Sequence, residues 1–73
     1  MKTNLLYIKE NKTTGAWDYI KVVTNTNGIT IYNYYKSDKD DAVKSTFNKY
    51  AFIEYLKSIQ VAKKYIKQVE NNM

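Results

Sequence analysis

The sequence contains no cysteine, no histidine and no proline. Without cysteine, neither a disulfide bond nor a thiolate metal site can form. Without histidine, the chain has no imidazole to act as a general base or a metal ligand near neutral pH. No convergent pair of carboxylates or nucleophile stands out either. The sequence therefore predicts a protein that is not an enzyme and that uses no cofactor.

Arginine is also missing, and all 12 basic residues are lysines. Arginine is the residue that reads guanine in a bidentate manner and clamps phosphate, whereas lysine acts as a point charge. The formal net charge of +5 still makes nucleic acid a candidate partner. We would then expect contacts to the phosphate backbone rather than base readout. Lys, Asn, Ile and Tyr are also typical of AT-rich coding sequences, so codon bias is the alternative explanation for part of the basic charge.

Long hydrophobic runs are absent as well. No stretch approaches the roughly 18 apolar residues of a transmembrane helix. The apolar residues near the start end at Ile8, which is too short for the core of a signal peptide. We therefore expect a cytoplasmic protein with no membrane partner. Its length suits a single domain, residues 1–73.

The chain is rich in β-branched and aromatic residues, including eight tyrosines. Alternation of apolar and polar residues predicts three strands, at about 4–10, 17–25 and 29–36. The turn-forming segments between these strands are short, as in consecutive hairpins. The pattern thus favours an antiparallel meander.

The dipeptide Asn27-Gly28 is the strongest turn signal in the chain. Both residues tolerate positive φ, as a two-residue type I′ hairpin requires. This turn would place Val23 opposite Tyr32, and residues that face each other across two strands share a face of the sheet. Ile31 would then point to the opposite face, towards the core.

The C-terminal part has a helical pattern. Apolar residues recur at steps of three and four over about 49–70, which predicts one amphipathic helix with Asn48 as its N-cap. The segment 42–47 is compatible with a short fourth strand or with an earlier start of the helix. Ser45 and Thr46 favour the strand because both are poor residues for a helix interior.

A sheet must bury one face, and the only available partner in this chain is the helix. The sequence therefore predicts an α+β fold, an antiparallel β-meander of three to four strands with one C-terminal α-helix packed on one face. The expected core consists of Leu6, Ile8, Ile20, Val22, Ile29 and Ile31 from the sheet and Phe52, Leu56, Ile59 and Ile66 from the helix. By the same parity, Tyr35 would lie at the edge of this core.

The other face of the sheet would then have no cover from the chain. Its predicted residues are aromatic side chains interleaved with lysines, namely Tyr7, Lys9, Trp17, Tyr19, Lys21, Tyr32 and Tyr34. Tyrosines can stack on bases while lysines neutralise phosphates. Tyrosine and tryptophan are also preferred residues in the centre of protein interfaces. The alternative is a solvated sheet face, because tyrosine forms strands well and its hydroxyl tolerates water.

The helix offers a second candidate surface for contact with phosphate. Four lysines fall in one sector beside the apolar stripe, namely Lys49, Lys57, Lys64 and Lys67. Such a cluster can bind a phosphate backbone with a steep dependence on salt. A solvated flank is the alternative, since lysines near a helix C-terminus interact favourably with its dipole.

The acidic run in residues 36–41 does not predict a metal site. The segment KSDKDD lacks the glycine and the distal glutamate of an EF-hand loop, so we expect a solvated loop and no bound metal.

These patterns lead to three functional hypotheses. The first is a small non-catalytic protein that binds nucleic acid or a nucleoprotein through the tyrosine- and lysine-rich sheet face. The second is an inhibitor or adaptor of the type encoded by phages and mobile elements, which binds a host protein. The third is an accessory protein that forms a homodimer. The sequence alone does not identify the partner.

Overall fold

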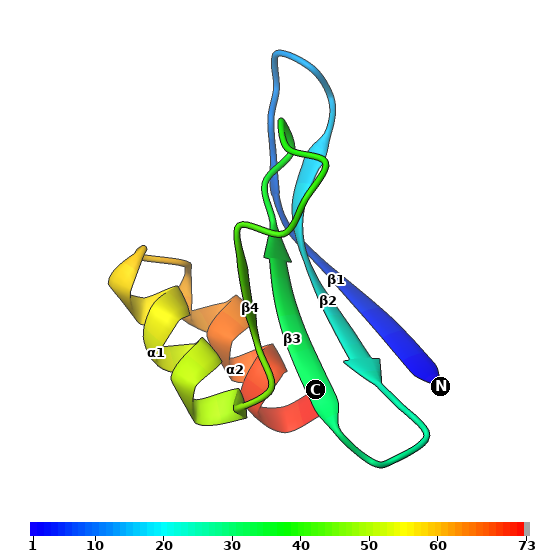
Figure 1. The fold of residues 1–73 in the computed structure, drawn as a ribbon. Helices are drawn as coiled ribbons and strands as arrows, with labels where there is room; N and C mark the ends of the chain where they lie inside the picture. Colours follow the sequence, from blue (N-terminus) through cyan, green and yellow to red (C-terminus); the bar gives the residue numbers. More distant parts are fainter. Residues whose placement is uncertain (73) are drawn as a thin grey trace.

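The computed structural model describes residues 1–72, and of Asn72 only the backbone. Four strands precede two helices, and all six elements form two layers, with the helices on one face of the sheet (Figure 1). The elements are β1 (Lys2–Glu10), β2 (Trp17–Thr24), β3 (Thr30–Tyr35), β4 (Lys44–Thr46), α1 (Lys49–Ser58) and α2 (Lys63–Asn72).

The sheet is a meander in which each strand pairs antiparallel with its neighbour in sequence, in the order β1-β2-β3-β4. The predicted α+β class and antiparallel sheet are thus confirmed. Within the segment that the sequence left open, residues 44–46 form the short strand β4. No helix within residues 1–72 is long and apolar enough to cross a membrane.

The prediction of a single C-terminal helix is wrong, because α1 ends and the chain turns back into α2. Gln60 adopts a left-handed conformation with φ of 62°. The Gln60 N–H donates to the carbonyl of Lys57, and the Val61 N–H donates to the carbonyl of Leu56, both at 3.1 Å. These two bonds are the pattern of a Schellman motif, which ends helices at a left-handed residue. Here that residue is not the usual glycine, so the sequence carries no stop signal.

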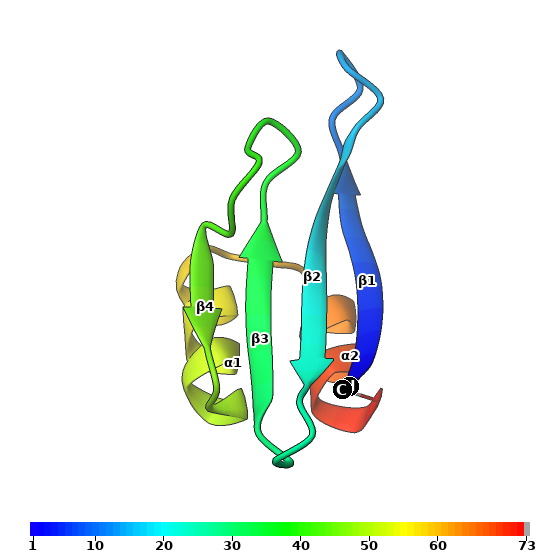
Figure 2. The same ribbon diagram turned by 45° about the vertical axis from the view of Figure 1, so that its right-hand side comes forward.

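The break allows the C-terminal segment to cover the whole sheet. A four-stranded sheet measures about 14 Å between its outer strands, whereas one helix is about 10 Å wide with its side chains. Figure 2 shows α1 behind β3 and β4, and α2 behind β1 and β2. Two short helices thus bury both halves of a face on which one long helix would cover a single stripe.

The loop between β2 and β3 is one residue longer than the sequence predicted. The Asn25 N–H donates to the carbonyl of Ile29 at 2.9 Å, so three residues lie in the loop, Thr26, Asn27 and Gly28. Gly28 has a φ of 82°, whereas Asn27 does not have the positive φ of a type I′ turn. The side chain of Asn25 also holds the loop, because its Oδ1 accepts the N–H of Asn27 at 2.9 Å and that of Ile29 at 3.0 Å.

This extra loop residue reverses the two faces of β3. Val22 pairs with Tyr32, and Ile20 pairs with Tyr34. A shift of one residue moves every side chain of a strand to the other face. Tyr32 and Tyr34 therefore lie beneath the helices and not on the uncovered face, which corrects the sequence prediction.

The core lies between the sheet and the two helices. Its buried residues are Ile8, Ile20, Val22, Tyr32, Tyr34, Phe52, Ile53, Leu56, Ile66 and Val69. The ring of Tyr32 stacks on that of Phe52 with centroids 5.6 Å apart. Three expected core residues lie elsewhere. Ile31 is half-buried on the uncovered face, and both Ile29, just before β3, and Ile59, just after α1, are exposed.

The start of α1 follows the sequence prediction. The Asn48 side chain accepts the backbone N–H groups of Tyr50 and Ala51, at 2.9 and 3.2 Å, so Asn48 is confirmed as the N-cap. Such a cap stabilises a helix by about 1 kcal/mol relative to alanine. It also fixes where the chain leaves β4 and crosses over the sheet.

Candidate binding surfaces

One face of the sheet is left uncovered by residues 1–72. We call it the open face, and its main side chains are Leu5, Tyr7, Trp17, Tyr19, Lys21, Val23, Ile31 and Tyr35. The strand register brings them together, since residues paired across antiparallel strands share a face. Tyr7, Trp17, Tyr19 and Lys21 are thus placed here as predicted. Leu5, Ile31 and Tyr35 were not predicted for this face.

The centre of the open face is a row of three tyrosines, one from each of β1, β2 and β3. Tyr7 pairs with Tyr19, and Tyr19 pairs with Tyr35. The rings of Tyr19 and Tyr35 are stacked, with centroids 4.8 Å apart and an angle of 6° between their planes. Tyr7 packs against Tyr19 at 5.9 Å with a tilt of 46°. The row is a preformed aromatic surface in which Tyr7 remains 54% exposed.

The sequence assigned Tyr35 to the wrong face of the sheet because its face depends on the loop before β3. The type I′ turn assumed for Asn27-Gly28 assigned Tyr35 to the core edge. The signal that could have corrected this assignment is Asn25, because an asparagine at the first position of a type I turn stabilises the longer loop through its side chain.

Lys9 does not lie on the open face, which corrects a second prediction. The register between β1 and β2 shifts between Tyr7 and Lys9, so that Lys9 pairs with Asp18. An extra residue of this kind is a β-bulge, which redirects the side chains that follow it. Lys9 therefore lines a pocket on the helix side of the sheet.

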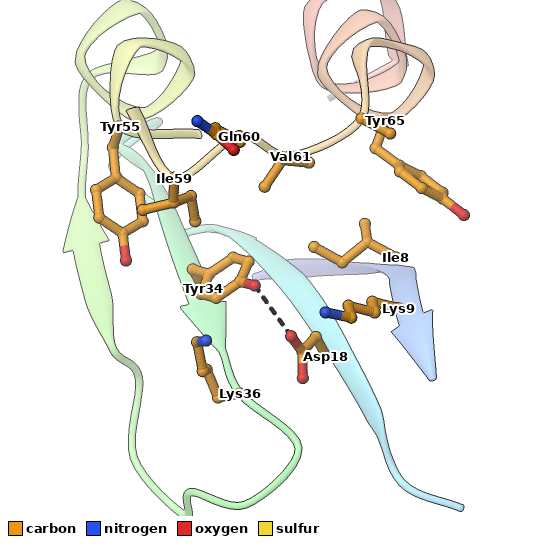
Figure 3. Close-up of a pocket in the computed structure, with 11 residues that line it drawn as sticks. Ile8, Lys9, Asp18, Tyr34, Lys36, Tyr55, Ile59, Gln60, Val61 and Tyr65 are labelled. Carbon is orange, nitrogen blue, oxygen red and sulfur yellow. Dashed lines mark hydrogen bonds between the residues drawn. The ribbon is translucent and has the colours of Figure 1, made fainter. Parts of the chain in front are cut away.

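This pocket, which we call the loop pocket, lies where the α1–α2 connection passes over the ends of β1, β2 and β3 (Figure 3). Its volume is about 380 Å³. The lining residues are Ile8, Lys9, Asp18, Tyr34, Lys36, Tyr55, Ile59, Gln60, Val61, Ala62 and Tyr65. The break in the helix supplies four of them in succession, residues 59–62, so the pocket exists because the helix is broken.

Asp18 is the one buried charged residue of this region, at 8% exposure. Its Oδ2 accepts the hydroxyl of Tyr34 at 3.1 Å, and its Oδ1 accepts the backbone N–H of Ser37 at 2.8 Å. These bonds satisfy the carboxylate and tie the segment after β3 to the start of β2. Buried carboxylates need such partners because desolvation disfavours their charge.

Of the four tyrosines predicted for partner contact, Tyr32 and Tyr34 are buried instead. Burial, and after it the negative charge of Asp18, raises the pKa of Tyr34 above its ordinary value. Burial alone raises the pKa of Tyr32. Both shifts follow from the cost of placing a phenolate away from water. Tyr34 still borders the loop pocket, together with Tyr55. The two rings pack edge to face, with their centroids 6.0 Å apart.

The four lysines predicted for phosphate contact do not share one helix face, because the chain breaks between them. Lys49 and Lys57 belong to α1, whereas Lys64 and Lys67 belong to α2. The ammonium of Lys49 donates to the carbonyl of Glu70 at 2.6 Å. The ammonium of Lys64 lies 4.9 Å from the centre of the Tyr65 ring.

The helix pair nevertheless gathers lysines in another combination. Lys57 of α1 and Lys63 and Lys67 of α2 line one hollow between the helices, and we call these three the helix lysine cluster. All three are exposed. Glu54 lies 3.6 Å from Lys57, but both side chains are well exposed, so this ion pair adds little. Lys63 had not been singled out in the sequence.

The acidic residues of the β3–β4 loop, Asp38, Asp40 and Asp41, are all exposed. Within residues 1–72 no group of three or more acidic side chains is arranged to hold a metal ion.

Comparison of the chain with protein-family models, with curated proteins and with solved structures finds no match.

Proposed function

We propose that this protein is a small non-catalytic binding protein whose open face docks on a partner protein. The observation that carries the proposal is the stacked row of Tyr7, Tyr19 and Tyr35 at the centre of an uncovered sheet. Tyrosines held rigidly by their neighbours lose little conformational entropy on binding, and they are frequent hot-spot residues. The lack of histidine and cysteine argues against catalysis.

A protein suits the open face better than single-stranded nucleic acid does. Base stacking requires a free aromatic face, and the stack of Tyr19 and Tyr35 occupies one face of each ring, while Tyr7 packs against Tyr19 as well.

Lys21 is the sole lysine among the main side chains of this face. Leu5 and Val23 are among the others, and these two aliphatic side chains favour an apolar partner surface. Glu10 pairs with Trp17 and so lies on the same face, where it balances the charge of Lys21, and the net charge of +5 favours an acidic partner only through long-range attraction.

The test begins with a photo-reactive amino acid placed at Tyr7 in cells that express the protein. The matched control position is Tyr50 of α1, which is 79% exposed on the helix side. We expect a protein cross-linked from position 7 and not from position 50. The identified partner is then purified, and its affinity is measured directly.

Two charge-introducing variants at exposed positions complete the test, Tyr7→Glu and Leu5→Glu. Each should weaken the partner's affinity about tenfold or more, as expected for a hot-spot residue. Tyr50→Glu should leave the affinity unchanged. A partner that is released by Tyr50→Glu but retained by Tyr7→Glu would refute the assignment of the open face. Sedimentation at high concentration shows whether that partner is a second copy of this chain.

A second candidate function is binding to a phosphate backbone, and the helix lysine cluster favours it. Lys57, Lys63 and Lys67 line one hollow together with Glu70. The two helices that carry them lie on the face of the sheet opposite the open face (Figure 2). Lysines that neutralise phosphates release counterions, which makes affinity fall steeply with salt. The two surfaces together suit a protein that acts on a nucleoprotein.

This second function is tested by measuring DNA affinity over a series of salt concentrations. Changing the cluster lysines to glutamine should reduce the slope of log affinity against log salt by about one for each phosphate that the protein no longer neutralises. The matched control changes three other exposed lysines, Lys2, Lys12 and Lys39, and thus the net charge by the same amount. Equal effects of the two triple variants would show non-specific attraction to the net charge.

A further inference from the structure

The loop pocket is independent of the open face, and it combines apolar walls with two ammonium groups. Ile8, Val61 and Ala62 supply aliphatic surface, and Tyr55 and Tyr65 supply half-buried rings. Pockets of a few hundred Å³ with mostly apolar walls and a few polar groups are typical of small-molecule sites. The two faces of the sheet thus present different chemistry.

The charges of the loop pocket are not balanced by its own residues. Lys9 and Lys36 line it together with one carboxylate, that of Asp18, so two positive charges face one negative charge. The ion pair between Lys57 and Glu54 is the one salt bridge among the described residues, so neither Lys9 nor Lys36 is paired with a carboxylate. Figure 3 shows the two lysines on either side of Asp18.

The Asp18 carboxylate is already engaged at the floor of the pocket. It accepts one hydrogen bond from the Tyr34 hydroxyl and one from the Ser37 backbone, on different oxygens. The carboxylate is also only 8% exposed, so an incoming cation has little access to it, whereas Lys9 and Lys36 are both exposed. The unpaired groups that remain for a ligand are the two ammonium ions.

We propose that the loop pocket binds a small organic anion with a flat apolar body and one carboxylate. The body lies between Tyr55, Tyr65 and the aliphatic side chains of the α1–α2 connection. The carboxylate pairs with the ammonium groups of Lys9 and Lys36 at the strand end of the pocket. Because these lysines reach the site from β1 and from the segment after β3, the ligand bridges the sheet and the helix connection.

Three probes of one shape test the proposal, naphthalene-2-carboxylate, naphthalene-2-carboxamide and 2-naphthylmethylammonium. Each is titrated into the full chain labelled with ¹⁵N while amide shifts are followed. The carboxylate is expected to shift the amides of Tyr34, Val61 and Ala62 and to bind more tightly than the other two. Tighter binding of the ammonium probe, equal binding of all three, or shifts confined to the open face would overturn the proposal.

Lysine variants test which ammonium groups pair with the carboxylate of the probe. Lys9→Gln and Lys36→Gln are each expected to weaken the binding of the carboxylate by about two- to fivefold and leave that of the amide unchanged, as for partly exposed ion pairs. Both side chains are exposed, so the fold is retained. Lys21→Gln on the open face removes the same net charge and should change neither affinity. A decrease with Lys21→Gln as large as with Lys36→Gln would contradict a localised anion site.

Discussion

The hydroxyl of Tyr34 donates a hydrogen bond of 3.1 Å to the carboxylate of Asp18, and the pair links the end of β3 to the start of β2. Both residues are buried. Such a bond contributes to stability mainly because loss of either partner leaves a polar group unsatisfied in the interior. Tyr34 is therefore a stabilising residue at the base of the loop pocket.

Replacing Tyr34 by phenylalanine should reduce the free energy of unfolding by about 1–3 kcal/mol near neutral pH, because Asp18 loses a donor. The pH dependence gives a second readout. The pKa of Tyr34 is raised in the folded state, so its contribution is complete below its ordinary pKa of about 10. It is lost as the pH rises further, since the unfolded chain then releases the proton first.

Urea unfolding at neutral and alkaline pH checks this prediction. The stability difference between the wild type and Tyr34→Phe should shrink above about pH 10. Tyr50→Phe is the control, because Tyr50 is exposed and should show no difference at either pH. A stability difference that stays constant at alkaline pH would contradict the raised pKa of the buried Tyr34 hydroxyl.

The reversed register of β3 makes opposite predictions for two tyrosines. Tyr32→Ala removes a buried ring that stacks on Phe52 and should cost about 3–5 kcal/mol. Tyr7→Ala removes an exposed ring and should cost about 1 kcal/mol, the value of its contact with Tyr19. Thermal unfolding followed by circular dichroism distinguishes the two. A cost for Tyr32→Ala as small as that for Tyr7→Ala would instead support the type I′ turn, which places both tyrosines on the uncovered face.

The stack of Tyr19 and Tyr35 should show energetic coupling in a double-mutant cycle. Alanine at each position, and then at both, should give an interaction free energy of about 0.5–1.5 kcal/mol from denaturant unfolding. The same cycle with Tyr19 and the exposed Tyr50 is the reference, since the two lie on opposite sides of the molecule and should be additive. Additivity for Tyr19 and Tyr35 would mean that the row is not rigid.

Gln60, the left-handed residue between the helices, allows a test of the break between α1 and α2. Gln60→Gly should stabilise the protein by about 0.5–1 kcal/mol, because glycine adopts positive φ without strain. Gln68→Gly makes the same change in the exposed interior of α2 and should destabilise by about 1 kcal/mol. Chemical denaturation compares the two. Equal destabilisation would indicate that one helix continues through residue 60.

The sequence predicted the class of the fold because alternating strands and a three- and four-residue helical period are local signals. It did not predict the register of β3, because Asn27-Gly28 is compatible with a two-residue and a three-residue loop, and the choice depends on Asn25. The helix break also carries no local signal. Gln60 is left-handed because covering the sheet requires it, and a tertiary requirement of this kind overrides propensity.

The prediction of the candidate site from sequence succeeded and failed for the same reasons. Tyr7, Trp17, Tyr19 and Lys21 were placed correctly because their face follows from alternation within one strand and from its neighbour. Lys9 was assigned to the wrong face because β1 contains a bulge before it, and no residue type in the sequence predicts that bulge. The loop pocket could not be predicted, because it depends on the path of the chain between the helices.

The order of the four strands has a consequence for how fast the chain folds. Every strand pairs with the next one in sequence, so each hairpin closes over a short loop and no distant segments must meet before the sheet forms. The chain also lacks proline, which removes the slow isomerisation step that delays many proteins. Refolding should therefore proceed in a single rapid phase.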